Sequence, residues 1–140
     1  VMFTEQKGIF HSQESIQKYV KEKFFSTNEY LFGIFLKNKH IGNIKLGPVD
    51  FVHKTAEISF FIGQVDYWGK GIMTKVINKL VSYSFENLGI EKISAGCYDE
   101  NIGSKKVLIK CGFKIEGRRV KQVIYNNKRI DVIIFGINSG

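Results

Sequence analysis

The sequence has few of the residues that mark disulfide-rich, metal-binding or membrane proteins. Its two cysteines, Cys97 and Cys111, and its three histidines, His11, His40 and His53, have the spacing of neither a zinc site nor a disulfide framework. No apolar run reaches the about 18 residues of a membrane-spanning helix, and the first residues lack the order of a secretory signal. We therefore expect two buried thiols, no metal, no membrane partner and a cytoplasmic location.

Acidic residues are also scarce, with 13 Asp and Glu against 21 Lys and Arg, which gives a formal net charge of +8. Seven of the basic residues lie between Lys105 and Lys121, where Glu116 is the one acid. Such a stretch predicts either an anion-facing surface or a solvated helix face followed by an exposed strand. Arginine-rich repeats and the aromatic-plus-basic signature of an RNA-binding sheet are absent from the sequence, so we expect no nucleic-acid partner.

A chain of 140 residues with 44% hydrophobic residues fits a single domain over residues 1–140. It begins with Val1 rather than methionine, and we expect the natural protein to have a further segment before it.

Periodicity and turn residues predict an α+β chain. Ser12 is a suitable N-cap for a helix, and the apolar residues that follow it have helical spacing. The predicted elements are a helix over about 13–25, hairpin strands 29–37 and 40–47, a strand 56–62, a helix 72–88, a strand 92–98, a helix 101–111 and strands 113–125 and 129–137. A helical crossover between strands 56–62 and 92–98 would make them parallel neighbours in a mixed sheet flanked by helices.

The segment W-G-K-G stands between a predicted strand and a predicted helix. Backbone N–H groups are unpaired at a helix start and carry the positive end of the dipole, which favours a phosphate group. Gly69 and Gly71 would allow a bulky anion to approach, and Lys70 adds charge, although a tight turn alone explains two glycines as well. The P-loop motif is missing, and the dinucleotide motif G-x-G-x-x-G fails at Lys75.

Several motifs together resemble one family. The W-G-K-G segment is followed by N-x-x-S at 101–104, K-x-G-F at 110–113, E-G-R at 116–118 and D-V at 131–132. In order and spacing this series resembles the GCN5-related N-acetyltransferases (GNAT), specifically their RimJ/RimL-like branch, over about residues 10–137. The resemblance implies a GNAT-like acyl-CoA N-acyltransferase fold without its first strand and helix, and acetyl-CoA as the cosubstrate.

The resemblance also implies where acetyl-CoA binds. The pyrophosphate would contact backbone amides of the loop, the pantetheine arm would pair with the strand before it, and one asparagine would contact the same arm. The residues concerned are Phe61, Ile62, Trp68, Gly69, Lys70, Gly71, Ile72, Met73, Thr74 and Asn101. Trp68 and Met73 depart from the residues most common in the family, but a methionine side chain can point away while its N–H binds phosphate.

Acetyl transfer to an amine needs a base for the amine proton and an acid for the departing thiolate. Glu57 stands where similar enzymes often carry the base, although a solvent-facing carboxylate is an equal alternative. The tyrosine that many relatives use as the acid is replaced by Leu108. Ser104 is the candidate in its place, the alternative being a helix residue bonded to backbone, and Tyr98 and Tyr125 are further candidates.

The acceptor side should be lined by His11, Tyr125 and Arg129, which suits a neutral or anionic amine better than a polyamine. RimJ/RimL-like enzymes acetylate protein N-termini, and similar sequences act on amino-sugar nucleotides or other small amines. A covalent acetyl-Cys97 is less expected than a buried thiol. The leading hypothesis is direct transfer by a monomer or homodimer, and the alternatives are a non-catalytic acyl-CoA-binding module or, more remotely, a nucleic-acid-binding protein.

Overall fold

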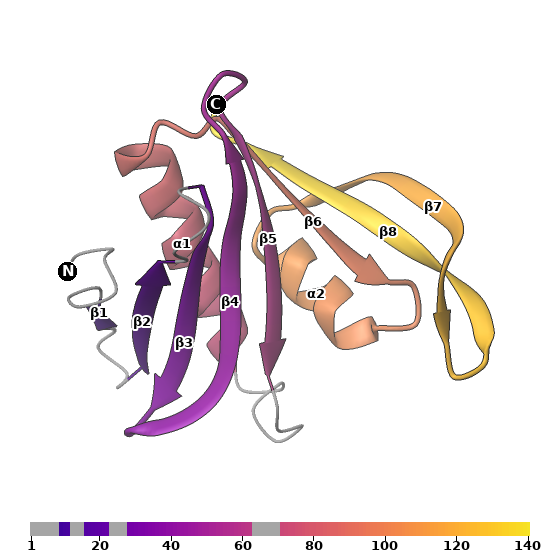
Figure 1. The fold of residues 1–140 in the computed structure, drawn as a ribbon, viewed down its shortest axis with the longest axis horizontal. Coiled ribbons are helices and arrows are strands. Elements are labelled where there is room, and N and C mark those ends of the chain that lie inside the picture. The colour runs from indigo at the N-terminus through magenta and orange to yellow at the C-terminus, as the bar shows by residue number, and fades with distance from the viewer. Residues whose placement is uncertain (1–8, 12–15, 23–27, 63–70) are drawn as a thin grey trace. The chain divides into compact units, whose positions relative to one another are not determined.

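A computed structural model describes residues 9–11, 16–22, 28–62 and 71–140, with side chains for 28–60 and 71–140 (Figure 1). The chain divides into two compact units, residues 1–72 and 73–140. The predicted parallel pairing of strands 56–62 and 92–98 would join the two units and stays a prediction.

Unit 1 contains five strands, each antiparallel to the next along the chain. They are β1 (Ile9–His11), β2 (Ile16–Glu22), β3 (Tyr30–Leu36), β4 (Lys39–Asp50) and β5 (Thr55–Ile62). The predicted hairpin of β3 and β4 is confirmed. Its turn is formed by Lys37 and Asn38, whose φ angles of 51° and 68° are the positive values that a tight two-residue hairpin turn requires.

The predicted helix over 13–25 is wrong where the structure describes it, because residues 16–22 form β2. Ile16, Tyr19 and Val20 fit a helical face, but they are also β-branched or aromatic residues that favour strands. In the structure they pair with β3 in a continuous register from Ile16 opposite Leu36 onward. Pairing with a partner distant in sequence therefore overrides the local 3.6-residue spacing, which a single sequence does not reveal.

One face of unit 1 is apolar. Side chains that alternate along three adjacent strands are buried, namely Phe32, Ile34, Ile44, Leu46, Ala56 and Ile58. The register of β4 and β5 shifts between Leu46 and Val49, which places the extra residues of a bulge opposite Glu57. Gly47 at this bulge has a φ of 137°, and a Cβ there would lie 2.7 Å from the backbone oxygen of Asn28. The bulge therefore requires glycine at this position.

Unit 2 holds both helices and three strands in the order β6-β8-β7, all antiparallel. The elements are α1 (Ile72–Asn87, of which Ile72 falls to unit 1), β6 (Lys92–Tyr98), α2 (Ile102–Lys110), β7 (Lys114–Tyr125) and β8 (Lys128–Asn138). The sequence predicted all five. Gly89 follows α1 with a φ of 69°, and Gly112 follows α2 with a φ of 92°, as left-handed residues that end helices.

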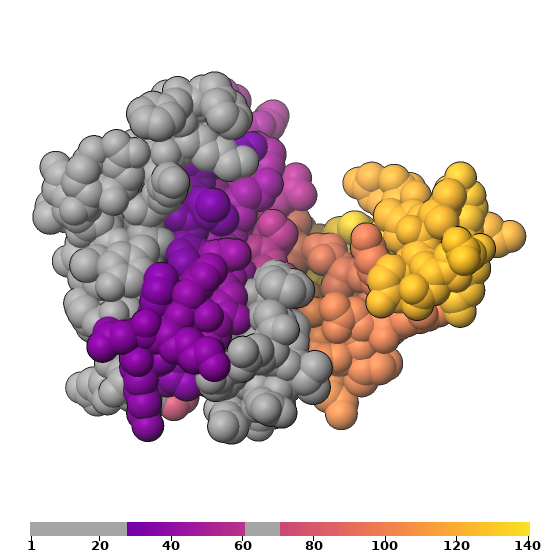
Figure 2. All heavy atoms as spheres, turned by 60° about the horizontal axis from the view of Figure 1, so that its bottom comes forward, coloured from indigo at the N-terminus to yellow at the C-terminus, as the bar shows by residue number. Residues whose placement is uncertain are grey.

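The β7–β8 hairpin turns through Asn126 and Asn127, both at positive φ. Most side chains of β7 are exposed, and atoms of this last part of the chain, coloured gold to yellow, lie at the surface in Figure 2. By contrast β8 contributes Ile133 and Phe135 to the core of the unit. The predicted exposed strand within the basic stretch is thereby confirmed for β7.

Candidate functional site

Part of the predicted cofactor site lies outside the described residues, namely Trp68, Gly69 and Lys70. Phe61 and Ile62 are the last two residues of β5, where the backbone follows β4 in register. His11 ends β1 and pairs with Gln17. These three residues belong to unit 1, and for them the structure gives the backbone path alone.

The described start of α1 has the properties expected of an anion-binding helix end. Gly71 lies just before the helix with a φ of 72°, a conformation that favours glycine. Ile72 and Met73 are buried, and Thr74 is half-buried. The side chain of Met73 is therefore directed inward and does not compete for the space outside its own N–H group. The first turn of α1 has no acidic side chain that would repel a phosphate.

Asn101 is the N-cap of α2. Its side-chain oxygen accepts a hydrogen bond from the Ser104 backbone N–H at 3.0 Å, and its own backbone N–H donates to the Tyr98 carbonyl at 2.9 Å. The Asn101 oxygen is thus engaged within the protein, and its side-chain amide group is the part that can contact a ligand.

Ser104 is 3% exposed, and no described residue forms a hydrogen bond with its hydroxyl group. The alternative role is that of a helix residue bonded to a backbone group, and no such bond of the Ser104 hydroxyl is present among the described residues. A buried hydroxyl without a partner costs about 1–3 kcal/mol, so it calls for an explanation. Leu108, on the same helix, is fully buried in the core, so this position carries an apolar side chain where many relatives have the tyrosine acid.

Four charged side chains meet beside the start of α2. Asp99 contacts Lys105 Nζ at 2.6 Å and Arg118 Nη1 at 3.0 Å. Arg118 Nη1 also lies 2.6 Å from Asp131 Oδ2, so one nitrogen bridges two carboxylates. The sequence motifs assign Asp99 no role. Two motif residues contact it, because Arg118 of E-G-R forms an ion pair with its carboxylate and Asp131 of D-V accepts its backbone N–H. The ion pair also shows that Lys105 is engaged with Asp99 rather than free for a phosphate.

The charges of this cluster reinforce one another. Hydrogen bonds from Lys105 and then Arg118 lower the pKa of Asp99. The backbone N–H of Lys121, followed by Arg118, lowers the pKa of Asp131. The bond to Asp131 and then that to Asp99 raise the pKa of Arg118. Asp99, Asp131 and Arg118 are therefore held in their charged forms at neutral pH.

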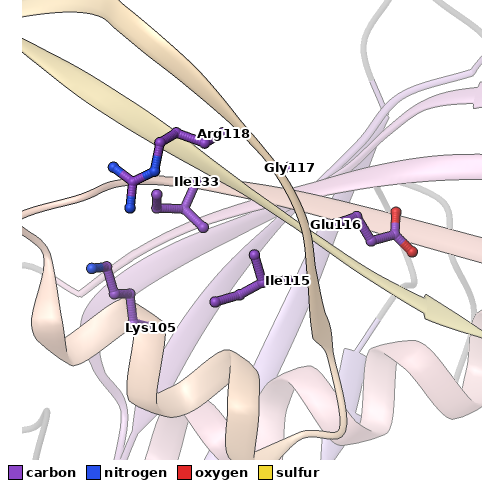
Figure 3. A pocket seen from close by; sticks show the side chains of 6 residues that line it. All are labelled: Lys105, Ile115, Glu116, Gly117, Arg118 and Ile133. Atoms are coloured by element: carbon purple, nitrogen blue, oxygen red, sulfur yellow. The ribbon is translucent and has the colours of Figure 1, made fainter.

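A hollow of about 380 Å³ lies between α2 and strands β7 and β8 (Figure 3). It is lined by Lys105, Ile115, Glu116, Gly117, Arg118 and Ile133. In Figure 3 Lys105 and Arg118 extend to one side, and Glu116 points to the other, where it pairs with Lys92 at 2.7 Å. Both cations at the hollow are thus bound to carboxylates of the protein.

The predicted acceptor residues of unit 2 lie near the turn of the β7–β8 hairpin. The rings of Tyr98 and Tyr125 meet edge to face, with centroids 5.5 Å apart, and both are more than 40% exposed. Arg129 Nη1 donates to the Lys121 carbonyl at 3.3 Å. The structure therefore brings together Tyr98 and Tyr125, the two further candidates for the acid. Glu57 is exposed on β5 of unit 1.

Both cysteines are buried and free, as predicted. Burial raises the pKa of Cys97, and it raises the pKa of Cys111 to about 11. Thiolates are therefore scarce at neutral pH, which disfavours a covalent acetyl-cysteine.

The described residues contain no group of three or more His, Cys, Asp or Glu arranged to hold a metal. None of the helices in the described ranges has the length and apolar character needed to cross a membrane.

Comparison with known proteins gives consistent matches. The family description "Acetyltransferase (GNAT) domain" matches residues 2–114. The probable N-acetyltransferase YjcK of Bacillus subtilis is 35% identical over 125 residues, which cover 87% of this chain and 64% of YjcK. The spermidine N(1)-acetyltransferase of Vibrio cholerae is 32% identical over 92 residues, which cover 66% of this chain and 53% of that protein. The chain thus spans between half and two thirds of the length of these two relatives.

Among solved structures, a chimera of the Vibrio cholerae spermidine N-acetyltransferase SpeG and hSSAT has a TM-score of 0.75 to this chain at 28% sequence identity. The alignment covers 82% of this chain and 69% of the chimera.

Proposed function

Because the chain belongs to the GNAT family of N-acetyltransferases, we propose that it transfers an acetyl group from acetyl-CoA directly to a primary amine. The predicted α+β fold of the GNAT type is confirmed by the solved structures that resemble it. We further propose that residues 1–140 form one N-acetyltransferase domain, of the RimJ/RimL-like branch, that acts in the cytoplasm as a monomer or homodimer.

The observation that carries this proposal is the start of α2. There a serine hydroxyl is buried without a described partner, one helical turn after the asparagine that we assign to the cosubstrate. A protein retains such a hydroxyl at a cost in stability, and a ligand atom that pairs with it would offset that cost. A thiolate leaving group is an acceptor of this kind.

Acetyl-CoA would bind through the two loops that precede α1 and α2. We assign its pyrophosphate to the backbone amides of residues 69–74, where the start of α1 carries no acid. The pantetheine arm would pair with the backbone of Phe61 and Ile62 and contact Asn101.

In the transfer step the neutral amine nitrogen attacks the thioester carbonyl carbon, so that an N–C bond forms and the C–S bond breaks. Glu57, directly or through water, takes the proton that the amine loses, and Ser104 donates a proton to the departing thiolate and regains one from solvent. The products are the acetylated amide and coenzyme A with a free thiol.

The acceptor is a protein N-terminus, an amino-sugar nucleotide or another small amine. Tyr125 and Arg129, with His11 from unit 1, would line its side of the site. The spermidine acceptor named for one relative makes a polyamine a necessary member of any test panel. That panel should therefore contain peptides, amino sugars and polyamines.

The second candidate is a non-catalytic acyl-CoA-binding module, which is favoured by Leu108 in the position of the usual tyrosine acid. Release of free thiol from acetyl-CoA across the amine panel separates the two candidates. We expect thiol release that depends on both amine and protein. Tight binding of acetyl-CoA without amine-dependent thiol release would favour the binding module.

A further inference from the structure

Arg118 lies on β7, and its side chain reaches the turn from which α2 starts. Its Nη1 is 3.0 Å from Asp99 Oδ2 and 2.6 Å from Asp131 Oδ2. Asp99 is the first residue after β6, and Asp131 is on β8. One guanidinium group therefore links β7 and β8 to the segment that leads into α2.

The segment between β6 and α2 is only three residues long, 99–101, and the backbone N–H groups of its first and last residues are bonded to strand residues. The Asp99 backbone N–H donates to the Asp131 carbonyl at 2.9 Å, and the Asn101 N–H donates to the Tyr98 carbonyl at 2.9 Å. The carboxylate of Asp99 reaches forward to Lys105 Nζ at 2.6 Å, on the second turn of α2. Asp99 therefore holds both the strand and the helix that the segment joins.

Arg118 also keeps two carboxylates together that would otherwise repel each other. Asp99 and Asp131 interact unfavourably by their charges, and each is stabilised by a hydrogen bond from Arg118. Asp131 in turn accepts the Lys121 backbone N–H at 2.8 Å, at the bulge where the β7 register shifts. Without the guanidinium group, Asp99 would lose one partner and face an unshielded like charge.

We propose that Arg118, acting through Asp99, is a positioning residue that fixes the start of α2 and thereby the Asn101 amide and the Ser104 hydroxyl. This inference rests on the proposed function, which assigns those two groups to acetyl-CoA. It gives the E-G-R and D-V motifs a role at the site although Arg118 itself is not assigned to any substrate. Displacement of a contacting group by about 1 Å can lower the rate on the order of 100-fold, so loss of the contacts that Arg118 makes with Asp99 and Asp131 should be measurable in kinetics.

The test compares Arg118→Gln with Arg119→Gln. Arg119 is the next residue of the same strand and is exposed, and its side chain forms no hydrogen bond or ion pair with the described residues. Its variant therefore removes the same charge without removing the contacts to Asp99 and Asp131. We expect Arg118→Gln to raise the KM for acetyl-CoA about tenfold and to lower kcat, with the acceptor KM changed less than about twofold. Arg119→Gln should match the wild type. Arg118→Lys should recover most of the loss, because an ammonium group can also bridge two carboxylates.

Amide hydrogen exchange provides a readout that does not depend on activity. The Ser104 amide, which donates to Asn101, should exchange faster in Arg118→Gln than in Arg119→Gln, while amides in the middle of α1 stay protected in both. If Arg118→Gln does not fold, Asp99→Asn provides the same comparison, since it keeps the shape and removes the charge.

The outcomes separate the two proposals. If the wild type binds acetyl-CoA but transfers acetyl to no amine, the proposed function fails, and positioning is decided by hydrogen exchange and by the affinity for acetyl-CoA. Equal exchange and equal acetyl-CoA parameters in the Arg118 and Arg119 variants would overturn the positioning role. An equal rise of both KM values would overturn it too, because that result indicates a general loss of structure.

Discussion

The two helices in the described part of the chain each bury one serine, and the two hydroxyl groups differ in what they bond to. Ser84, near the end of α1, is 0% exposed and donates to the Leu80 carbonyl at 2.7 Å. Ser104, at the start of α2, is 3% exposed and has no hydroxyl partner among the described residues. A serine that only fills space in a helix normally bonds to the preceding turn, as Ser84 does. Ser104 lies in the first turn of α2, and its unbonded hydroxyl is the observation on which the proposed role toward acetyl-CoA rests.

The largest effect on turnover is expected from the residue that takes the proton of the acceptor amine. Glu57→Gln keeps the shape and removes the base, so turnover should fall by about 10²–10⁴-fold while acetyl-CoA affinity stays constant. The ratio of wild-type to variant rates should narrow as the pH approaches the pKa of the acceptor amine, because a neutral amine needs no base. Steady-state kinetics across pH measure both effects.

The matched control for this prediction is Glu86→Gln, which removes an exposed carboxylate from α1 instead. Its rates should equal those of the wild type. An equal loss in the two variants, or a Glu57→Gln defect that is constant with pH, would contradict the assignment of the base.

A second effect concerns the two ends of α1. Gly71 and Gly89 both have positive φ angles, 72° and 69°, and a Cβ would meet no atom within 4 Å at either position. Valine should strain the backbone similarly at both, but only Gly71 adjoins the amides that we assign to the pyrophosphate. We expect Gly71→Val to weaken acetyl-CoA binding by about 1–3 kcal/mol and Gly89→Val to leave it unchanged, as measured by calorimetry.

If both valine variants bind acetyl-CoA as the wild type does, with the fold intact, the cosubstrate does not use the start of α1. If both weaken it equally, the effect comes from helix stability rather than from the contact.

The smallest effect is expected on acidification. The pKa values of Asp99 and Asp131 are lower in the folded protein than their ordinary values. The stability that these carboxylates contribute is therefore complete above the unfolded-state pKa of about 3.9, and it is lost as the pH falls through the lowered folded-state values. The start of α2 should be unchanged between about pH 5 and 7 and should loosen below about pH 4.

Hydrogen exchange at the Ser104 amide, after correction for the intrinsic rate, follows this transition. Arg118→Gln should shift the loosening to higher pH, because the pKa values of both carboxylates would rise. An identical acid transition in the wild type and the variant would contradict the coupling of Arg118 to the two carboxylates.

Sequence patterns predicted unit 2 well because its elements are defined locally. Asn101 caps α2, Gly89 and Gly112 follow the helix ends at positive φ, and Asn126 and Asn127 form the turn of the last hairpin. Residues 16–22 show the opposite case. Their apolar spacing fits a helix, but pairing with β3 makes them a strand, and that pairing joins residues that are distant in sequence.

The candidate site was predictable in its residue types but not in its connections. The sequence indicated Asn101 as the cap of a helix and Ser104 as a candidate acid, and only the structure shows that the serine hydroxyl is buried and left unbonded among the described residues. The partners of Asp99 come from α2 and β7, and no spacing rule links a strand end to a cation 19 residues later.

The most direct test measures kcat at saturating acetyl-CoA for Ser104→Ala and Ser84→Ala side by side. We expect Ser104→Ala to lower kcat by about 100-fold or more, without the recovery at high pH expected for Glu57→Gln. Its unfolding free energy without ligand should be at or above that of the wild type, because the substitution removes a buried hydroxyl that has no partner. Ser84→Ala should keep kcat and lose about 1 kcal/mol of unfolding free energy with its hydrogen bond. Equal kcat values in the two variants would contradict the claim that the buried hydroxyl of α2 serves the transfer reaction.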